Sequence, residues 1–251
     1  MLIIAHRGNS SRHIENTQPA FEQAIADGAK AIECDIHQVG GGFYVFHDFT
    51  LERLCNRTER LADLSEKQIK TLKVKGKHPI LSMEELFDIV QGRVTINLGL
   101  KAINEPLHFI ESLNRCITTT ITSIESTKDE TGSMPKNTQI DIVVSSFNHP
   151  MLASIKSALR QSPYNHQIRV AALVAHLPMD HAAYAQHLGA DIAAIDAQLV
   201  EADFVEDAHN RYLDVWCYTV NREDDLLRLK AMGVDAVFSD DPAWARAVIK
   251  C

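Results

Sequence analysis

The feature of this sequence that most constrains its fold is an alternation between short apolar runs and stretches with helical spacing. Eight apolar runs recur along the chain: Leu2–Ala5, Ala29–Ile36, Val94–Leu100, Ile140–Ser146, Ile168–Val174, Asp191–Ile195, Leu213–Val220 and Val234–Ser239. Between most of them, apolar residues recur three and four positions apart, which predicts helices. The clearest helical stretches are Thr17–Ala26, Asn148–Arg160, Met179–Leu188, Arg222–Met232 and Pro242–Ile249. Strands that alternate with helices in this way are typical of α/β folds with a parallel sheet.

Eight predicted strands without a Gly- or Pro-rich linker favour a single (β/α)8 barrel of the TIM type over residues 1–251. An open doubly wound sheet is the rival, and a length of 251 residues fits either fold. No GxGxxG pattern follows the first strand, which weakens the dinucleotide-binding form of that rival. The sequence therefore predicts one barrel domain.

Three segments interrupt the simple alternation. The glycines at 40–42 are followed by Phe43–His47, which predicts a turn and a short extra strand. Asp48–Glu85 is a long excursion between the second and third barrel strands, and we interpret it as a small insertion. Ser123–Asn137 is polar and rich in Ser and Thr, which predicts an exposed loop.

Composition argues against several classes of protein. Hydrophobic residues make up 45% of the chain, which supports a sizeable core. The net charge of −8 argues against a general binder of nucleic acid or of anionic membranes. An odd number of cysteines, five, without a CxxC pair argues against a disulfide framework or a zinc knuckle. No apolar run approaches the roughly 18 residues of a spanning helix, and the start lacks the basic region of a signal peptide. We therefore expect a reduced, cytoplasmic protein without a stable membrane anchor. The sequence gives no basis for an oligomeric state.

Polar residues collect at the C-terminal ends of the predicted strands. These ends form one rim of a (β/α)8 barrel, and the chemistry of such barrels is carried there. The strand ends are His6-Arg7, Glu33-x-Asp35-x-His37, His47-Asp48, Gly99-x-Lys101, Ser145-Ser146-Phe147, Tyr218-Thr219 and Ser239-Asp240. Their concentration predicts a functional site at this rim.

Glu33 and Asp35 are candidate ligands of a divalent metal. They are two positions apart on a predicted strand, so their side chains share a face and Cys34 points the other way. Two neighbouring carboxylates repel unless a cation or a proton lies between them, and oxygen-only ligands favour Mg²⁺ or Ca²⁺. Spacing alone leaves open both a metal site and a polar strand end with solvated carboxylates. His37 shares the face, and a rim position is favoured over a role as ligand.

His6 and His47 are candidates for proton transfer, because histidine titrates near neutral pH. Arg7 and Lys101 could clamp a phosphoryl group, although each alone is more often a surface charge. The chain has twelve histidines, and most carry no such spacing.

Several motifs in order give this chain a resemblance to the glycerophosphodiester phosphodiesterase family over nearly its whole length. "AHRG" followed by "ENTQPAF" is similar to the opening motif of that family, "AIECDIH" to its metal-binding strand, and "VFHDFTLERL" to its second-histidine motif. "PILSMEELF", "VVSSFN", "YTVN" and "GVDAVFSDDP" are similar to its later landmarks. The order of so many motifs makes the resemblance specific.

The resemblance implies a (β/α)8 barrel and metal-dependent hydrolysis of a glycerophosphodiester to sn-glycerol 3-phosphate and an alcohol. It implies His6 and His47 as the general acid and base, and Glu33 and Asp35 as ligands of a divalent metal, Mg²⁺ or Ca²⁺. It also implies that a glycerol hydroxyl of the substrate can attack first and give a cyclic phosphate that water opens.

The resemblance also assigns the substrate contacts. Arg7 and Lys101 would hold the phosphate, and Tyr218 would wall the glycerol or the alcohol group. Glu15 and Asn16 of the opening motif would shape the site. A related barrel phospholipase acting on membrane lipid is a third hypothesis, against which the sequence shows no hydrophobic anchor or basic amphipathic helix.

Gly99 departs from the family pattern. The third strand of the family usually ends in Asn-Ile-Glu-x-Lys, with that glutamate as a third metal ligand, whereas here the stretch is Asn97-Leu98-Gly99-Leu100-Lys101. Glycine has no side chain to ligate a metal, so we expect weaker affinity. Water, substrate oxygens or another rim residue could complete the shell. The alternatives are a weakened or inactive member that binds glycerophosphate-like ligands, or a chance or engineered change in this chain. The enzyme is favoured because the histidines, Arg7 and Lys101 are all present.

Overall fold

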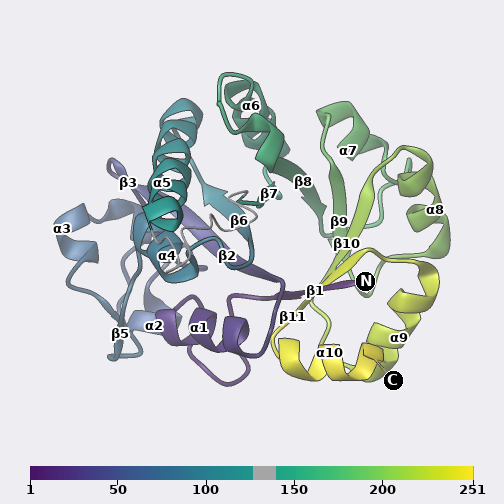
Figure 1. Cartoon of the computed structure of the whole chain (residues 1–251), viewed down its shortest axis with the longest axis horizontal. Coiled ribbons are helices and arrows are strands. Elements are labelled where there is room, and N and C mark those ends of the chain that lie inside the picture. Colours follow the sequence, from purple (N-terminus) through teal and green to yellow (C-terminus); the bar gives the residue numbers. More distant parts are fainter. Residues whose placement is uncertain (127–139, 251) are drawn as a thin grey trace.

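Eight parallel strands close into a barrel in the computed structural model, which describes residues 1–126 and 140–250 (Figure 1). The strands are β1 (Leu2–Ala5), β2 (Ala31–Val39), β6 (Thr95–Ala102), β7 (Ile142–Ser146), β8 (Ile168–Val174), β9 (Ile192–Asp196), β10 (Asp214–Tyr218) and β11 (Ala236–Ser239). They pair in chain order, and β1 pairs with both β2 and β11. The predicted (β/α)8 barrel is confirmed, and the open sheet is excluded.

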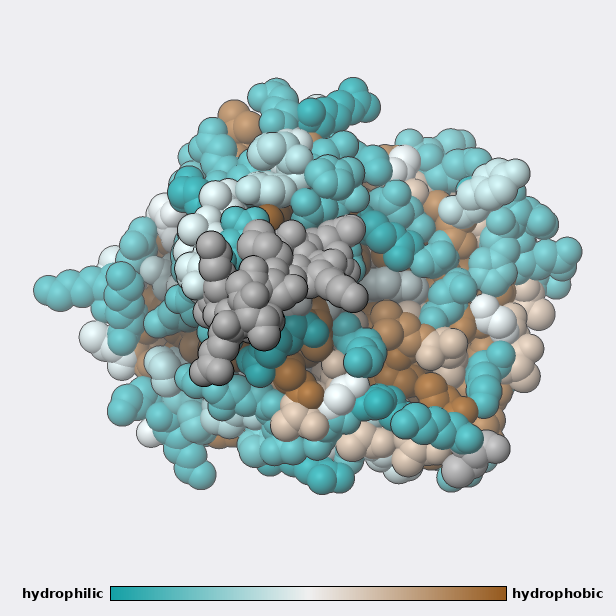
Figure 2. All heavy atoms as spheres, viewed as in Figure 1, coloured by the Kyte–Doolittle hydropathy of each residue, from teal (hydrophilic) through white to brown (hydrophobic). Residues whose placement is uncertain are grey.

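Helices surround the barrel and cover the outer faces of its strands (Figure 1). They are α1 (Gln18–Ala26), α4 (Met83–Val90), α5 (Pro106–Ser126), α6 (His149–Leu159), α7 (Ala183–Leu188), α8 (Ala202–Asn210), α9 (Glu223–Met232) and α10 (Pro242–Lys250). On the face seen in Figure 2, hydrophilic side chains cover most of the surface, and hydrophobic atoms lie mainly in hollows between them. In α6, for example, the buried residues Met151, Leu152, Ile155, Ala158 and Leu159 recur three and four positions apart, so this helix is amphipathic, as its periodicity predicts.

The core has two layers because each barrel strand is buried on both sides. Between strands and helices lies a large cluster that includes Ile32, Cys34 and Ile36 of β2. Inside the barrel lies a smaller cluster of Ile4, Ala31, Val143, Ala171, Ile192, Ala194, Trp216, Ala236 and Phe238. Every barrel strand except β6 contributes to this inner cluster. At the corresponding positions β6 carries Asn97 and Gly99, so its interior face is polar and open.

A hairpin and a small subassembly lie between β2 and β6. The predicted extra strand is β3 (Gly42–Val45), and its antiparallel pairing with β2 extends β2 to Val39. Short elements follow: α2 (Glu52–Cys55), η1 (Leu61–Asp63), α3 (Glu66–Ile69), β4 (Lys73–Val74) and β5 (His78–Pro79). Their apolar side chains form a separate cluster with residues of the hairpin. Residues 83–85, the last of the predicted excursion, already belong to α4, whose N-terminus is capped by Ser82 and Glu85.

The prediction of an exposed loop at Ser123–Asn137 is wrong for its first residues. Ser123–Ser126 form the last turn of α5, while 127–137 lie outside the described residues. The hydroxyls of Thr122 and Ser126 donate to main-chain carbonyls of the preceding turn, so a polar composition is compatible with helix here. Within the described parts of the chain, no helix is both long enough and apolar enough to cross a bilayer.

Candidate active site

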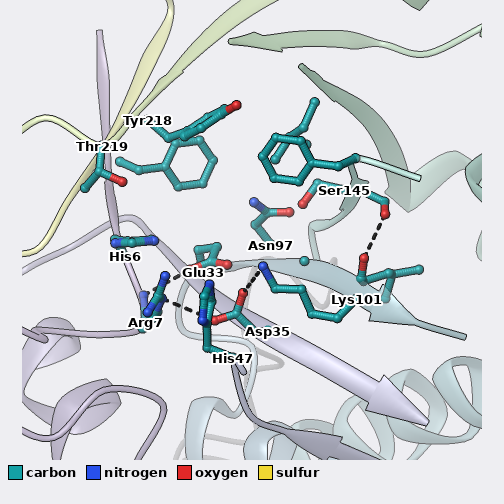
Figure 3. A pocket seen from close by; sticks show the side chains of 16 residues that line it. His6, Arg7, Glu33, Asp35, His47, Asn97, Lys101, Ser145, Tyr218 and Thr219 are labelled. Atoms are coloured by element: carbon teal, nitrogen blue, oxygen red, sulfur yellow. Dashed lines mark hydrogen bonds and ion pairs between the residues drawn. The ribbon is translucent and has the colours of Figure 1, made fainter. Parts of the chain in front are cut away.

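The C-terminal ends of the barrel strands surround a cavity of about 200 Å³ (Figure 3). All seven residues that the sequence predicts for the site line this cavity: His6, Arg7, Glu33, Asp35, His47, Lys101 and Tyr218. The remaining walls include Asn97, Gly99, Ser145, Ser146, Phe147, Thr219 and Phe238. The structure thus brings together, from opposite ends of the sequence, the residues that the strand-end argument selects.

Asp35 is a buried carboxylate held by two cations. Its side chain comes from β2 and is 2% exposed. Oδ1 lies 3.0 Å from Nζ of Lys101, and Oδ2 lies 3.3 Å from Nε of Arg7. Asn16 also donates to Oδ2 through Nδ2 at 2.9 Å. Burial raises the pKa of Asp35, but the charges of Lys101 and Arg7 outweigh it, so the net shift is downward and Asp35 is ionised.

Glu33 lies on the same face of β2, but its negative charge is offset much less by neighbouring positive groups than that of Asp35. It is 6% exposed, and the main-chain N–H of Arg7 donates to its Oε2 at 3.0 Å. Burial raises the pKa of Glu33, and the neighbouring charge of Asp35 raises it further. The two carboxylates therefore form an unequal pair, in which an added cation would relieve the repulsion.

His6 and His47 are each held by an aspartate through Nδ1. Nδ1 of His6 lies 2.7 Å from Oδ1 of Asp240, and Nδ1 of His47 lies 2.6 Å from Oδ1 of Asp48. An ionised carboxylate only accepts hydrogen bonds, so each Nδ1 carries the proton and each Nε2 is left for the cavity.

The pKa values of the two histidines shift in opposite directions. Burial lowers the pKa of His6, but the hydrogen bond to Asp240 and the charge of Glu33 outweigh it, and the net shift is upward. Burial also lowers the pKa of His47, and there it outweighs the effects of Asp35 and Asp48. At neutral pH, His6 therefore holds a proton more readily than His47 does.

Glu15 and Arg53 connect the barrel rim to the insertion. Oε1 of Glu15 accepts from Nη1 of Arg7 at 2.8 Å, and Oε2 lies 2.5 Å from Nη1 of Arg53. Arg53 also donates through Nε to Asp48 at 2.7 Å, and it helps to lower the pKa of Asp48 to about 2, against the effect of burial. The shaping role predicted for Glu15 thus has a concrete form, whereas sequence reasoning missed Arg53. The only feature of the sequence that could have pointed to Arg53 is its place within the motif "VFHDFTLERL".

His37 and Tyr218 occupy different surroundings. His37 is buried and does not line the cavity; its Nε2 donates to the main-chain oxygen of His47 at 3.3 Å, and its ring meets Phe49 edge-on. This geometry fits the rim position and leaves Nε2 engaged. Tyr218 donates its hydroxyl to the carbonyl of Val174 at 2.6 Å, and its ring packs edge-on against Phe147, so it forms an aromatic wall.

Gly99 lies in register between Asp35 of β2 and Ser145 of β7. A Cβ atom at this position would lie 3.0 Å from Oε1 of Glu33 and 3.7 Å from Oδ1 of Asp35. A side chain at 99 would therefore adjoin both carboxylates. Over residues 1–126 and 140–250, no group of three or more His, Cys, Asp or Glu side chains is placed to hold a metal ion.

The family model of the glycerophosphoryl diester phosphodiesterases matches residues 6–244. The chain belongs to this family. With it, the chain belongs to the phosphodiester hydrolases. It is 28% identical to the protein YqiK of Bacillus subtilis over 99% of this chain and 98% of that protein. It is 26% identical to a glycerophosphodiester phosphodiesterase of Caldanaerobacter subterraneus over 96% and 94% of the two chains.

Solved structures show the same fold. A phosphodiesterase of Oleispira antarctica in complex with the product sn-glycerol 3-phosphate superposes with a TM-score of 0.83 at 24% identity, over 100% of this chain and 97% of that one. A glycerophosphodiester phosphodiesterase from Galdieria sulphuraria, described as putative in its name, gives 0.80 at 22% identity, over 100% and 98%.

Members of the family generally depend on a divalent metal. In this chain, the carboxylates of Glu33 and Asp35 supply hard oxygen donors at the strand ends, as Mg²⁺ and Ca²⁺ require. Glu33 and Asp35 both line the cavity, and the pKa of Glu33 is raised by burial and then by the charge of Asp35, so a cation between them would relieve their repulsion. The two carboxylates are suitable ligands for such an ion, but two protein ligands alone do not complete its coordination shell.

Proposed function

We propose that this chain hydrolyses glycerophosphodiesters to sn-glycerol 3-phosphate and an alcohol, with His6 and His47 as the acid–base pair. The observation that carries the proposal is that both histidines line a cavity that also holds Arg7 and Lys101, with each Nδ1 bound to an aspartate so that Nε2 is the nitrogen left for a substrate. Family membership supports the reaction class, and the product bound to the Oleispira antarctica relative supports a small-molecule substrate.

The opposite directions of the two pKa shifts support different roles for the two histidines. His47, with its pKa lowered by burial, accepts the proton of the attacking hydroxyl as a new P–O bond forms. His6, with a net raised pKa, donates its proton to the oxygen of the leaving alcohol as that P–O bond breaks. When the attacking group is a glycerol hydroxyl, the product is a cyclic phosphate. Water then opens it with the two roles exchanged.

Arg7 and Lys101 bind the phosphoryl oxygens in this proposal. Both cations lie against Asp35, which fixes their positions at the cavity floor. Preorganised positive charge at this point stabilises the negative charge that develops in the transition state. Tyr218 forms the wall beside the glycerol or alcohol group.

Glu33 and Asp35 would hold the divalent cation, Mg²⁺ or Ca²⁺. When bound, such an ion supplies Lewis-acid stabilisation to the phosphoryl oxygens. A second candidate function follows from Gly99: a weakened family member that binds glycerophosphate-like ligands without turnover.

The decisive experiment measures release of sn-glycerol 3-phosphate from glycerophosphocholine and glycerophosphoethanolamine in Mg²⁺, Ca²⁺ or chelator. Gly99→Glu is assayed beside the wild type. The backbone at Gly99 does not have a positive φ. The new Cβ would lie 3.0 Å from Oε1 of Glu33 and 3.3 Å from the main-chain oxygen of Cys34, so both neighbours would have to shift by a few tenths of an ångström. Turnover by the wild type that stops in chelator supports the metal-dependent enzyme. Turnover by Gly99→Glu alone favours the ligand-binding member.

Substitutions of the histidines test the acid–base assignment. His6→Ala and His47→Ala should each lower the rate by about 10² to 10⁴. His209→Ala is the matched control, because His209 also pairs with an aspartate, Asp235 at 2.9 Å, but does not line the cavity. Wild-type rates in both cavity variants would contradict the proposal.

The cysteine pattern supports our proposal of a reduced, cytoplasmic setting. Cys34, Cys55, Cys116 and Cys217 are free thiols in the described chain. Cell fractionation tests this location directly.

A further inference from the structure

Asn97 is a buried amide without hydrogen-bond partners. It lies on β6, is 1% exposed and lines the active-site cavity. Neither Nδ2 nor Oδ1 has a partner within residues 1–126 and 140–250. A buried polar atom without a hydrogen-bond partner destabilises the folded state, because it has lost its hydrogen bonds to water. Other buried asparagines are satisfied, since Asn9 donates to Asp27 and Asn16 donates to Asp35. The exception at Asn97 points to a ligand in the cavity.

The strand register places Asn97 beside the acidic pair. Asn97 of β6 is directly opposite Glu33 of β2, and Gly99 is opposite Asp35. Residues two apart on a strand share a face, so all four positions face the cavity. Figure 3 shows the Asn97 side chain projecting into the cavity above Glu33. Because Gly99 has no side chain, the space next to the two carboxylates remains open on the β6 side.

We propose that Oδ1 of Asn97 is the third protein oxygen of the divalent-cation site, together with Glu33 and Asp35. The inference rests on the metal site of the proposed function and assigns it a ligand. Asparagine carbonyl oxygens are ordinary ligands of Ca²⁺ and Mg²⁺. A neutral ligand also suits this site, because a third buried carboxylate would add to the repulsion between Glu33 and Asp35.

Metal titration of the substrate-free protein tests this assignment. Mn²⁺ binding is followed by electron paramagnetic resonance, and Ca²⁺ binding by calorimetry. Asn97→Leu keeps the approximate size of the side chain and removes the oxygen, so affinity should fall by about tenfold or more. Asn97→Asp keeps an oxygen ligand and adds a charge, so affinity should rise by about tenfold.

Thermal unfolding in chelator shows whether the variants are folded. Asn97→Leu should unfold at the wild-type temperature or above, because it removes an unsatisfied buried group. Asn97→Asp should unfold at a lower temperature and regain stability when metal is added.

Asn148→Asp is the matched control for added charge. Asn148 lies at the rim and caps α6 through its side-chain oxygen, a role that aspartate also performs. Because this charge is outside the proposed coordination shell, metal affinity should change by less than about threefold.

Wild-type affinity in folded Asn97→Leu would overturn the assignment, as would a wild type that binds neither ion. The proposed function fails separately, if the wild type and Gly99→Glu release no sn-glycerol 3-phosphate under any condition. Metal-dependent turnover together with unchanged affinity in Asn97→Leu would therefore remove Asn97 from the site and leave the enzyme intact.

Discussion

At the scale of single residues, two aspartates set the balance between the histidines of the cavity. Burial lowers the pKa of His6, but Asp240 together with the charge of Glu33 outweighs it, whereas Asp48 only reduces the lowering of the pKa that burial causes at His47. If His47 acts neutral and His6 acts protonated, activity rises with pH through the pKa of His47 and falls through that of His6.

Asp240→Asn and Asp48→Asn should therefore move different limbs of the pH profile. Asp240→Asn removes a cause that raises the pKa of His6, so the alkaline limb should move to lower pH. Asp48→Asn should lower the pKa of His47 further, so the acid limb should move to lower pH. The measurement is kcat/KM against pH for the wild type and both variants. A shift of the acid limb in Asp240→Asn would show that the two roles are reversed.

Sequence reasoning located the cavity residues because strand ends of a barrel converge, but it could not find all of their partners. His6 and Lys101 directly follow apolar runs that predict strands, and Glu33 lies in the last half of another, so their shared rim follows from the fold. Arg53 reaches Glu15 across 38 positions from a four-residue helix, and no periodicity predicts that contact. The unpartnered amide of Asn97 also depends on three-dimensional neighbours that the sequence does not reveal.

At the scale of elements, the barrel strands and the presence of an insertion were predictable, but the short helices and strands within the insertion were not. Strands buried on both faces give long apolar runs, and β1 and β8 match their predicted bounds, Leu2–Ala5 and Ile168–Val174. Elements of two to four residues, such as α2 and β4, are too short to show a period. Their positions depend on the separate apolar cluster, which holds Arg53 next to the site.

Leu61→Ala tests whether that cluster supports the site. Leu61 is 0% exposed, and its truncation should lower the free energy of unfolding by about 2–5 kcal/mol. Turnover should also fall, because the cluster positions α2 and the contact of Arg53 with Asp48 beside His47. Urea unfolding and product release are measured beside Leu107→Ala, a leucine that is 51% exposed on α5. Equal stability of the two variants would show that the cluster does not anchor the insertion.

At the scale of the whole molecule, barrel closure assembles the site. His6 and Asp240 are 234 positions apart, and the pairing of β1 with β11 brings them together. The same closure encloses Glu33 and Asp35 in a low-dielectric interior, where two neighbouring charges cost free energy. The packing of the rest of the barrel must therefore offset the free energy that is lost by burying Glu33 and Asp35 side by side.

Glu33→Gln should make the whole molecule more stable and less active. The pKa of Glu33 is raised in the folded protein, first by burial and then by the charge of Asp35. The free energy of unfolding therefore falls as the pH rises through the folded-state pKa, because Glu33 must then be ionised inside the protein. Glutamine does not ionise, so the variant avoids this decrease in stability, and its side-chain oxygen can still accept a hydrogen bond from the main-chain N–H of Arg7. In chelator, the variant should exceed the wild type by roughly 1–3 kcal/mol at pH 8, and the difference should shrink toward pH 5.

Glu15→Gln is the matched control with the opposite sign. Burial raises the pKa of Glu15, but its contacts with Arg53 and Arg7 outweigh it and the net shift is downward. Its stabilisation is therefore present above the unfolded-state pKa and is lost as pH falls through the folded-state value. Glu15→Gln should be less stable than the wild type at pH 8 in urea unfolding. If Glu33→Gln instead kept the same stability difference at both pH values, the charge of Glu33 would not be the cause. The destabilisation at this site would then come from side-chain packing, which glutamine also alters, and not from repulsion between the carboxylates of Glu33 and Asp35.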